Sequence, residues 1–493
     1  MTELTFAQKE NIGFQFVLDA MQPCSPYGQE HLRQLRPMGK AQKGELLRQL
    51  CNVQRVLEGE AACKAALSAV LRVLMAVKMV RATAQKCLET DLNEIELFEL
   101  KRFLLQTREL LPHWHQAQAV LQLEGIAFRD TEAALDILDP EANRVATFYI
   151  SDAYDPALAA IRAEKRALET QIRLTDADRE KERLLAQRSA VAAREEQAEA
   201  RIREAMSLAL RPYIPAMLEN MAAMAELDVT VEKARLARRW GGVMPVLTDS
   251  RVAMTQMCNP RILESLKDRG QDFTPISITL DRGATVITGA NMGGKSVALK
   301  TLALNLLLIQ CGCFPFAKTA SAPLFDGIYI LSEDLENVER GLSSFGGEMV
   351  RFNEIVKRLD GQFAFLLLDE FARGTNPEEG AAIVQAVTEY LNRQNAVSVL
   401  ATHFDGVAAH AGAHYQVVGL RELDLEQVRR ELAGLQGLSG AEHIGRYMNY
   451  GLYRVEDARD CPRDALNICR LLGMEPEILE IVEKNYGVET KKC

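Results

Sequence analysis

The most informative stretch of this 493-residue chain is a glycine-rich segment at residues 289–296. It reads Gly-Ala-Asn-Met-Gly-Gly-Lys-Ser and matches the pattern G-x-x-x-x-G-K-[ST]. A short β-like run, residues 285–288, precedes it, and an apolar helical run follows it. Such a loop turns its backbone N–H groups towards a phosphate at the start of a helix. The segment therefore predicts a strand, a phosphate-binding loop and a helix in an α/β domain.

Each residue type in this loop has its own task in phosphate chemistry. Lys295 is expected to reach the β- and γ-phosphates of ATP, and the Ser296 hydroxyl is expected to bind Mg²⁺. The glycines let the backbone wrap around the phosphates. The other residues of the segment that we expect to contact the nucleotide are Gly289, Asn291, Met292, Gly293, Gly294 and Val297.

Two further segments place polar side chains at the ends of apolar runs. Asp369 and Glu370 follow an apolar run, residues 363–368, that is typical of a strand buried on both faces. Asp369 is the expected second partner of Mg²⁺, and Glu370 is a carboxylate able to orient or deprotonate water. His403 follows a third run, residues 397–401, where it could contact the γ-phosphate or the attacking water.

These segments resemble the MutS family of ABC-type ATPases. Residues 369–377, Asp-Glu-Phe-Ala-Arg-Gly-Thr-Asn-Pro, and residues 342–349, Leu-Ser-Ser-Phe-Gly-Gly-Glu-Met, are similar to that family's Asp-Glu motif and signature loop. The resemblance implies ATP hydrolysis at a site shared by two subunits, with Ser343 and Ser344 of one facing the nucleotide of the other. It also implies that Phe273 stacks on adenine, although core packing explains this ring nearly as well. Ala290 and Val297 depart from the family's usual Pro and Thr.

The rest of the chain predicts an α plus α/β fold, in which helices precede an ABC-type ATPase domain with a mixed, mostly parallel sheet. A β-like run at residues 146–150 interrupts the first helices. Between residues 156 and 210 we expect an extended helix or an antiparallel helical pair. The expected parts are a helical core or lever (1–155), a projecting arm with a return helix (156–240), the ATPase domain (241–420) and a C-terminal region with a helical dimerisation element (421–493).

Composition limits the partners and the location. The net charge is −10, from 58 Lys and Arg against 68 Asp and Glu, which argues against a large basic face for DNA. The ten cysteines form no Cys-x-x-Cys pair and suit buried thiols in a reducing compartment. The most apolar stretch, residues 302–309, is too short to cross a bilayer, and the first residues do not resemble a signal peptide. We expect a cytoplasmic protein without membrane contact.

Three functions fit these features. The first is an ATP-driven remodeller of a protein, because residues 402–408 and 464–473 resemble the ATPase subunit of the lysine 5,6-aminomutase reactivase; that resemblance implies a cobalamin-dependent aminomutase as partner. The second is an ATP-dependent clamp of the mismatch repair or recombination type on double-stranded or branched DNA. The third, ATP binding without hydrolysis, fits poorly with an intact Glu370 and His403. The acidic balance, and the room of only about 270 residues before the ATPase, favour the first.

In the first two functions ATP binding closes a dimer and hydrolysis reopens it. The second subunit is either another copy of the chain or a related protein.

Overall fold

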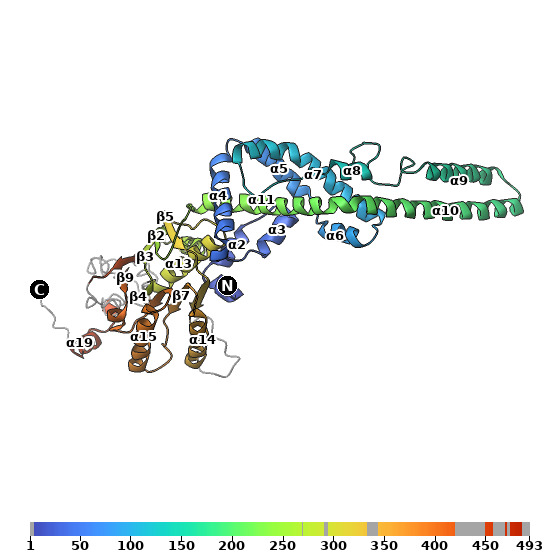
Figure 1. Cartoon of the computed structure of the whole chain (residues 1–493). Coiled ribbons are helices and arrows are strands. Elements are labelled where there is room, and N and C mark those ends of the chain that lie inside the picture. Colours follow the sequence, from blue (N-terminus) through green and yellow to red (C-terminus); the bar gives the residue numbers. More distant parts are fainter. Residues whose placement is uncertain are drawn as a thin grey trace. The chain divides into compact units, whose positions relative to one another are not determined.

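The computed structural model describes residues 4–268, 270–289, 294–332, 344–419, 449–456, 469–470 and 474–485. The chain divides into two compact units (Figure 1). Unit 1 contains Met1–Met21, Leu35–Gln54 and Lys233–Cys493, and unit 2 contains Gln22–Gln34 and Arg55–Glu232. The two units are groups of residues in mutual contact, and each joins segments that are distant in the chain. They do not test the four consecutive parts expected from the sequence, which remain a prediction.

Unit 2 is helical. Its long helix α7 (Glu94–Leu121) begins at a capping box, in which Asn93 and Glu96 satisfy each other's backbone N–H groups. Leu97, Leu100 and Leu104 lie on one face of α7 and are buried. The other helices of this unit are α3 (Pro26–Arg33), α5 (Lys64–Ala76), α6 (Arg81–Glu89), α8 (Glu132–Leu138), α9 (Pro156–Leu174), α10 (Asp178–Leu210) and η2 (Arg211–Tyr213), with parts of α4 (Lys43–Gly59) and α11 (Ile214–Trp240).

Helices α9 and α10 form an antiparallel pair (Figure 1). The side chain of Asp155 caps α9 and Pro156 occupies its first turn, as both residue types favour. Ion pairs join the two helices: Arg162 contacts Glu195 at 3.1 Å and Glu199 at 2.7 Å. Of the two arrangements expected for residues 156–210, the structure has the helical pair.

The β-like run at residues 146–150 is not a strand, so this prediction was wrong. The backbone carbonyl of Thr147 accepts a hydrogen bond from Lys101 Nζ at 2.9 Å, in place of a strand partner. Lys101 is itself buried and paired with Asp139 at 3.1 Å. β-propensity alone does not make a strand, because a strand also needs a neighbour with which to pair.

Unit 1 contains a six-stranded sheet with the order β10-β9-β4-β8-β7-β6. All neighbouring strands are parallel except β9 and β10, so the expected mixed, mostly parallel sheet is present. The strands are β4 (Gly283–Thr288), β6 (Gly327–Leu331), β7 (Ala364–Asp369), β8 (Ala396–Ala401), β9 (Ala413–Gly419) and β10 (Asn449–Arg454).

Helices cover both faces of this sheet. Helices α14 (Ser344–Leu359) and α15 (Pro377–Asn392) pack on one face, where Phe352 and Val384 meet Leu366 and Leu368 of β7 in one buried cluster. Helix α13 (Lys295–Gln310) lies on the opposite face (Figure 1). Strands β4, β7 and β8 are buried along their whole length, as expected for parallel strands between helical layers.

The remaining elements of unit 1 surround this layered core. A second sheet has the order β1-β5-β2-β3. No helix among the described residues is long and apolar enough to cross a membrane. The elements are α1 (Phe6–Asn11), α2 (Phe14–Ala20), η1 (Lys40–Gln42), β1 (Val246–Thr248), β2 (Val252–Met257), α12 (Pro260–Asp268), β3 (Ile276–Leu280), β5 (Thr319–Pro323), η5 (Val407–His410) and α19 (Pro476–Asn485).

Candidate functional site

The carboxyl ends of β4, β8 and β7 lie next to one another, and the predicted site residues follow them. Gly289 follows β4, Asp369 ends β7 and His403 comes two residues after β8. Asp369 pairs with Ala401 of β8, and the N–H of Glu370 donates to the Ala401 carbonyl at 3.0 Å. Ligands of parallel sheets bind at this edge. The fold therefore brings together the three segments that the sequence predicts to act together.

Lys295 is the first residue of α13 and is almost completely buried. Its Nζ donates to the Gly289 carbonyl at 2.6 Å and lies 3.9 Å from Oε1 of Glu370. Burial lowers the pKa of Lys295, whereas the charges of Glu370 and Asp369 act to raise it. Gly289 and Gly294 have φ angles of 135° and 90°, which side chains with a Cβ rarely adopt. Glycine is the residue type that adopts these two backbone conformations without strain, one at the end of β4 and one at the start of α13.

Asp369 is buried at the end of β7 and interacts with the hydroxyl of Ser296. Burial raises the pKa of Asp369, while the hydrogen bond from Ser296 acts to lower it. Its Oδ1 atom and the Oγ of Ser332 are buried and have no hydrogen-bond partner among the described residues. A carboxylate oxygen held this way is available to a cation or a water molecule.

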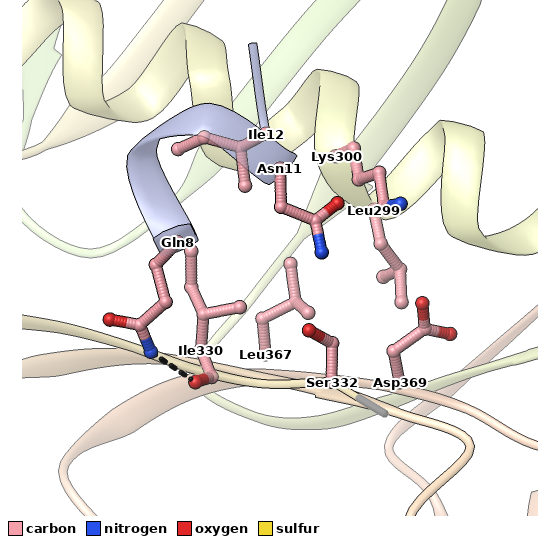
Figure 2. Close-up of a pocket in the computed structure, with 9 residues that line it drawn as sticks. All are labelled: Gln8, Asn11, Ile12, Leu299, Lys300, Ile330, Ser332, Leu367 and Asp369. Carbon is pink, nitrogen blue, oxygen red and sulfur yellow. Dashed lines mark hydrogen bonds between the residues drawn. The ribbon is translucent and has the colours of Figure 1, made fainter. Parts of the chain in front are cut away.

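Asp369 and Ser332 line a cavity of about 10 Å³, which is room for about one water molecule (Figure 2). Gln8, Asn11 and Ile12 of the N-terminal segment form the opposite wall (Figure 2). Gln8 Nε2 donates to the carbonyl of Ile330, in the edge strand β6, at 2.9 Å. The first helix of the chain is therefore part of the surroundings of Asp369, which sequence reasoning missed, because no pattern links residues so far apart.

Glu370 has an unusual backbone and a close cationic partner. Its φ angle is 55°, in the left-handed region that non-glycine residues seldom occupy. Its Oε2 accepts a hydrogen bond from Nη1 of Arg373 at 2.6 Å. Only 11% of the Glu370 side chain is exposed, so the pair lies in a partly desolvated position. Arg373 belongs to the segment that resembles the family's Asp-Glu motif, but the motif alone assigns no role to this arginine.

His403 lies close enough to Glu370, Lys295 and Arg373 for their charges to affect its pKa. The residue is exposed, and its ring rests against Phe404 with the centroids 4.5 Å apart. Partial burial of the ring lowers the pKa of His403, whereas the charge of Glu370 acts to raise it. A neutral imidazole can accept or donate a hydrogen bond at neutral pH.

Of the remaining predicted site residues, the structure describes Ser296, Val297 and Phe273. Ser296 and Val297 line an open pocket of about 570 Å³ beside the start of α13, together with Glu10, Arg261 and Lys300. Phe273 is half-buried between α12 and β3. Asn291, Met292, Gly293 and Ser343 lie outside the described residues, as does the side chain of Ser344, which begins α14.

Tyr450 of β10 is a neighbour of Gly294 that sequence reasoning missed. A Cβ atom on Gly294 would lie 2.3 Å from Cδ1 of Tyr450, so the ring packs directly on this glycine. The pKa of Tyr450 is raised by burial. The aromatic residues of the 447–454 run are a weak strand signal, and nothing in their spacing points to the loop 156 residues earlier.

Residues 285–468 match MutS domain V. Among the similar proteins is Endonuclease MutS2 of Symbiobacterium thermophilum, with 32% identity over 250 residues, which are 50% of this chain and 31% of that protein. Endonuclease MutS2 of Geobacillus kaustophilus is 31% identical over 248 residues, 49% of this chain and 31% of that protein. Over these segments the chain is therefore similar to proteins of the MutS family.

The MutS domain V match contains every predicted site residue from Gly289 to His403, whereas Phe273 precedes it. Endonuclease MutS2 of Geobacillus sp. matches over 288 residues at 28% identity, 57% of this chain and 33% of that protein. The matched segments thus span about a third of the length of these relatives. The more specific resemblance to the aminomutase reactivase is not supported by these matches.

Proposed function

We propose that this protein is a Mg²⁺-dependent ATPase that works as a dimer and closes on DNA when ATP is bound. The observation that carries the proposal is the meeting of Lys295, Asp369 and Glu370 at the carboxyl edge of a parallel sheet, within the segment that matches MutS domain V. A buried cation next to two carboxylates suits the phosphates of ATP and the metal ion that accompanies them.

Asp369 and Ser296 fit the role of Mg²⁺ ligands. The two side chains already contact each other, and Oδ1 of Asp369 has no partner among the described residues. Mg²⁺ prefers oxygen ligands and keeps several of its water molecules. When bound, the ion would neutralise phosphate charge that develops during hydrolysis.

Glu370 is the residue we assign as general base. In this role its carboxylate accepts a proton from the attacking water, while Lys295 stays with the phosphates and His403 orients the water. Nη1 of Arg373 donates to Oε2 of Glu370 at 2.6 Å, and Oε1, 3.9 Å from Nζ of Lys295, is the oxygen that we assign to the water.

We further propose that the active site is shared between two subunits. Ser343 and Ser344 would face the nucleotide of the other subunit, in line with the resemblance of residues 342–349 to a signature loop. The C-terminal helix α19 supports a dimer, because its Ile478 and Ile481 are 50% and 55% exposed. Apolar side chains exposed along one helix are typical of an interface.

DNA is the partner that the similar proteins favour, since they are endonucleases by name. The α9–α10 pair is the candidate contact, because it is rich in Arg and Lys, although many of these pair with Glu across the helices. The acidic net charge would confine DNA contact to a local surface. Nothing in the matches supports an aminomutase as partner.

The test uses Glu370→Gln, which is expected to bind ATP, hydrolyse it at least about a hundredfold more slowly and accumulate as a dimer. DNA titrations of this trapped dimer, with homoduplex, mismatched and branched DNA, are made at two salt concentrations. Binding that weakens steeply with salt supports the DNA clamp. If the variant turns over at the parental rate, Glu370 is not the base. If the trapped dimer does not bind DNA but captures an aminomutase from cell extract, the partner is a protein.

A further inference from the structure

The turn that follows β7 is held in an uncommon backbone conformation. Glu370 and Ala372 have φ angles of 55° and 62°, and neither is a glycine. Residues in this left-handed region are strained and persist only where neighbouring groups hold them. Because Glu370 is the proposed base, whatever holds this turn also sets the position of the base.

Helix α14 holds the turn through two side chains one helical turn apart. Oε2 of Glu348 accepts a hydrogen bond from the N–H of Ala372 at 3.0 Å. The ring of Phe352 packs on Phe371, with centroids 5.0 Å apart, and both rings are buried. Residues four apart on a helix share a face, so one face of α14 contacts two consecutive residues of the turn.

Helix α15 closes the other side of the turn. A Cβ atom on Gly380 would lie 3.0 Å from the carbonyl oxygen of Ala372 and 2.6 Å from Cζ of Phe404. The turn therefore has little room to relax towards α15. One contact that it can lose without a clash is the hydrogen bond to Glu348.

We propose that Glu348 is a positioning residue that keeps the 370–372 turn, and with it Glu370, in the conformation needed for hydrolysis in its own subunit. The inference rests on the proposed ATPase function. Glu348 also lies in residues 342–349, which resemble a signature loop that faces the other subunit's nucleotide. The alternative to be tested is therefore that Glu348 acts on the partner's nucleotide directly.

The first experiment measures hydrogen exchange of the peptide that contains residues 370–374. Glu348→Ala removes the acceptor of the Ala372 N–H, so the exchange of this amide should become at least about tenfold faster. Glu348→Gln keeps a carbonyl oxygen at the same place and should retain most of the protection. Glu354→Ala, an exposed glutamate of the same helix, is the matched control and should leave the exchange unchanged. Equal protection in Glu348→Ala and the parent would overturn the proposal.

The second experiment measures the kinetics of the same variants. We expect kcat of Glu348→Ala to fall about tenfold or more, because a displaced base is less effective, with KM for ATP little changed. Glu348→Gln should recover most of kcat. A glutamine variant as slow as the alanine variant contradicts a role as hydrogen-bond acceptor. A parent protein that does not hydrolyse ATP would count against the proposed function, whereas the exchange experiment still decides the role of Glu348.

A mixed dimer separates the two subunits. One chain carries Lys295→Ala, so that only the phosphate loop of the other chain works. If Glu348 acts on its own Glu370, Glu348→Ala slows the dimer when placed in the chain with the intact loop. If it slows the dimer only when placed in the Lys295→Ala chain, Glu348 acts across the interface and the proposal is wrong.

Discussion

At the scale of single residues, the burial and the neighbours of Lys295 favour the binding of an anion. Lys295 is 2% exposed and lies between the Gly289 carbonyl and the carboxylate of Glu370. A buried ammonium group beside a carbonyl and a carboxylate can bind a further anion, because an anion offsets the cost of burial. This residue, Ser296 and the Asp369–Glu370 pair were predictable from sequence, since the spacing in each motif is short and local.

Lys295→Ala is expected to weaken ATP binding at least about tenfold, because a charged contact to the phosphates is lost. The measurement is the affinity for a fluorescent ATP analogue with Mg²⁺ present, together with a melting curve that verifies folding. Lys357→Ala, an exposed lysine of α14, serves as the control. Unchanged affinity in Lys295→Ala would refute the assignment of the phosphate site.

Lys101 carries a structural prediction in unit 2. Its side chain is 7% exposed and pairs with that of Asp139, which is 5% exposed. Burial acts to raise the pKa of Asp139, but hydrogen bonds from the Arg144 backbone and from Lys101 outweigh it and lower the pKa. Because the pKa of Asp139 is lower in the folded protein, its carboxylate stabilises the fold at pH values above the pKa of the unfolded chain. This stabilisation is lost as the pH falls through the folded-state pKa.

Lys101→Ala should therefore destabilise unit 2 by about 3 kcal/mol at neutral pH, because it leaves a buried carboxylate with one cationic partner fewer. Urea unfolding followed by circular dichroism gives the value. The control is Arg108→Ala, which removes the exposed pair with Glu132 and should cost no more than about 1 kcal/mol. Similar losses in both variants would show that the burial of the Lys101 pair does not matter.

At the scale of elements, a helix or strand is predictable when the residues that begin it and the apolar residues that it buries both follow a local sequence pattern. Helix α15 is an example, because Asn376 caps it, Pro377 occupies its first turn and an apolar face follows. Strands β7 and β8 are continuous apolar runs and were also expected. Strand β10 was missed because its residues are only half-buried, and residues 146–150 were misassigned because their backbone bonds to a lysine side chain.

Helix α19 gives an element with exposed apolar residues. Replacing both Ile478 and Ile481 with Glu should weaken dimerisation in ATP at least about tenfold, since each isoleucine buried in an interface contributes about 1.5–3 kcal/mol. Sedimentation velocity of the ATP-bound protein measures the change. Glu480→Gln, on the same helix, is the control. A dimer of unchanged affinity would exclude α19 from the interface.

At the scale of the whole molecule, the proposed sharing of the active site by two subunits predicts that ATP binding and ATP turnover can be separated. Ser344→Arg places a large cation at the start of α14, outside the phosphate loop of its own chain. We expect ATP binding to a single chain to stay within about twofold, while steady-state hydrolysis falls at least about tenfold. The two quantities are compared on the same preparation. Normal hydrolysis by this variant would contradict a site that needs both subunits.

Unit 1 is assembled from three stretches of chain, and this order affects how the protein is made. The stretch that begins at Lys233 emerges from the ribosome about 180 residues after residues 35–54, and still later after residues 1–21. At about 5–20 residues per second this interval lasts roughly 10–35 s. During it the first helix, with the Gln8 side chain that later bonds to Ile330, has no sheet to dock on. Unit 2, apart from Gln22–Gln34, is a continuous stretch and is synthesised before the sheet of unit 1. Residues 1–21 and 35–54 therefore remain without their packing partners until the stretch after Lys233 has been synthesised.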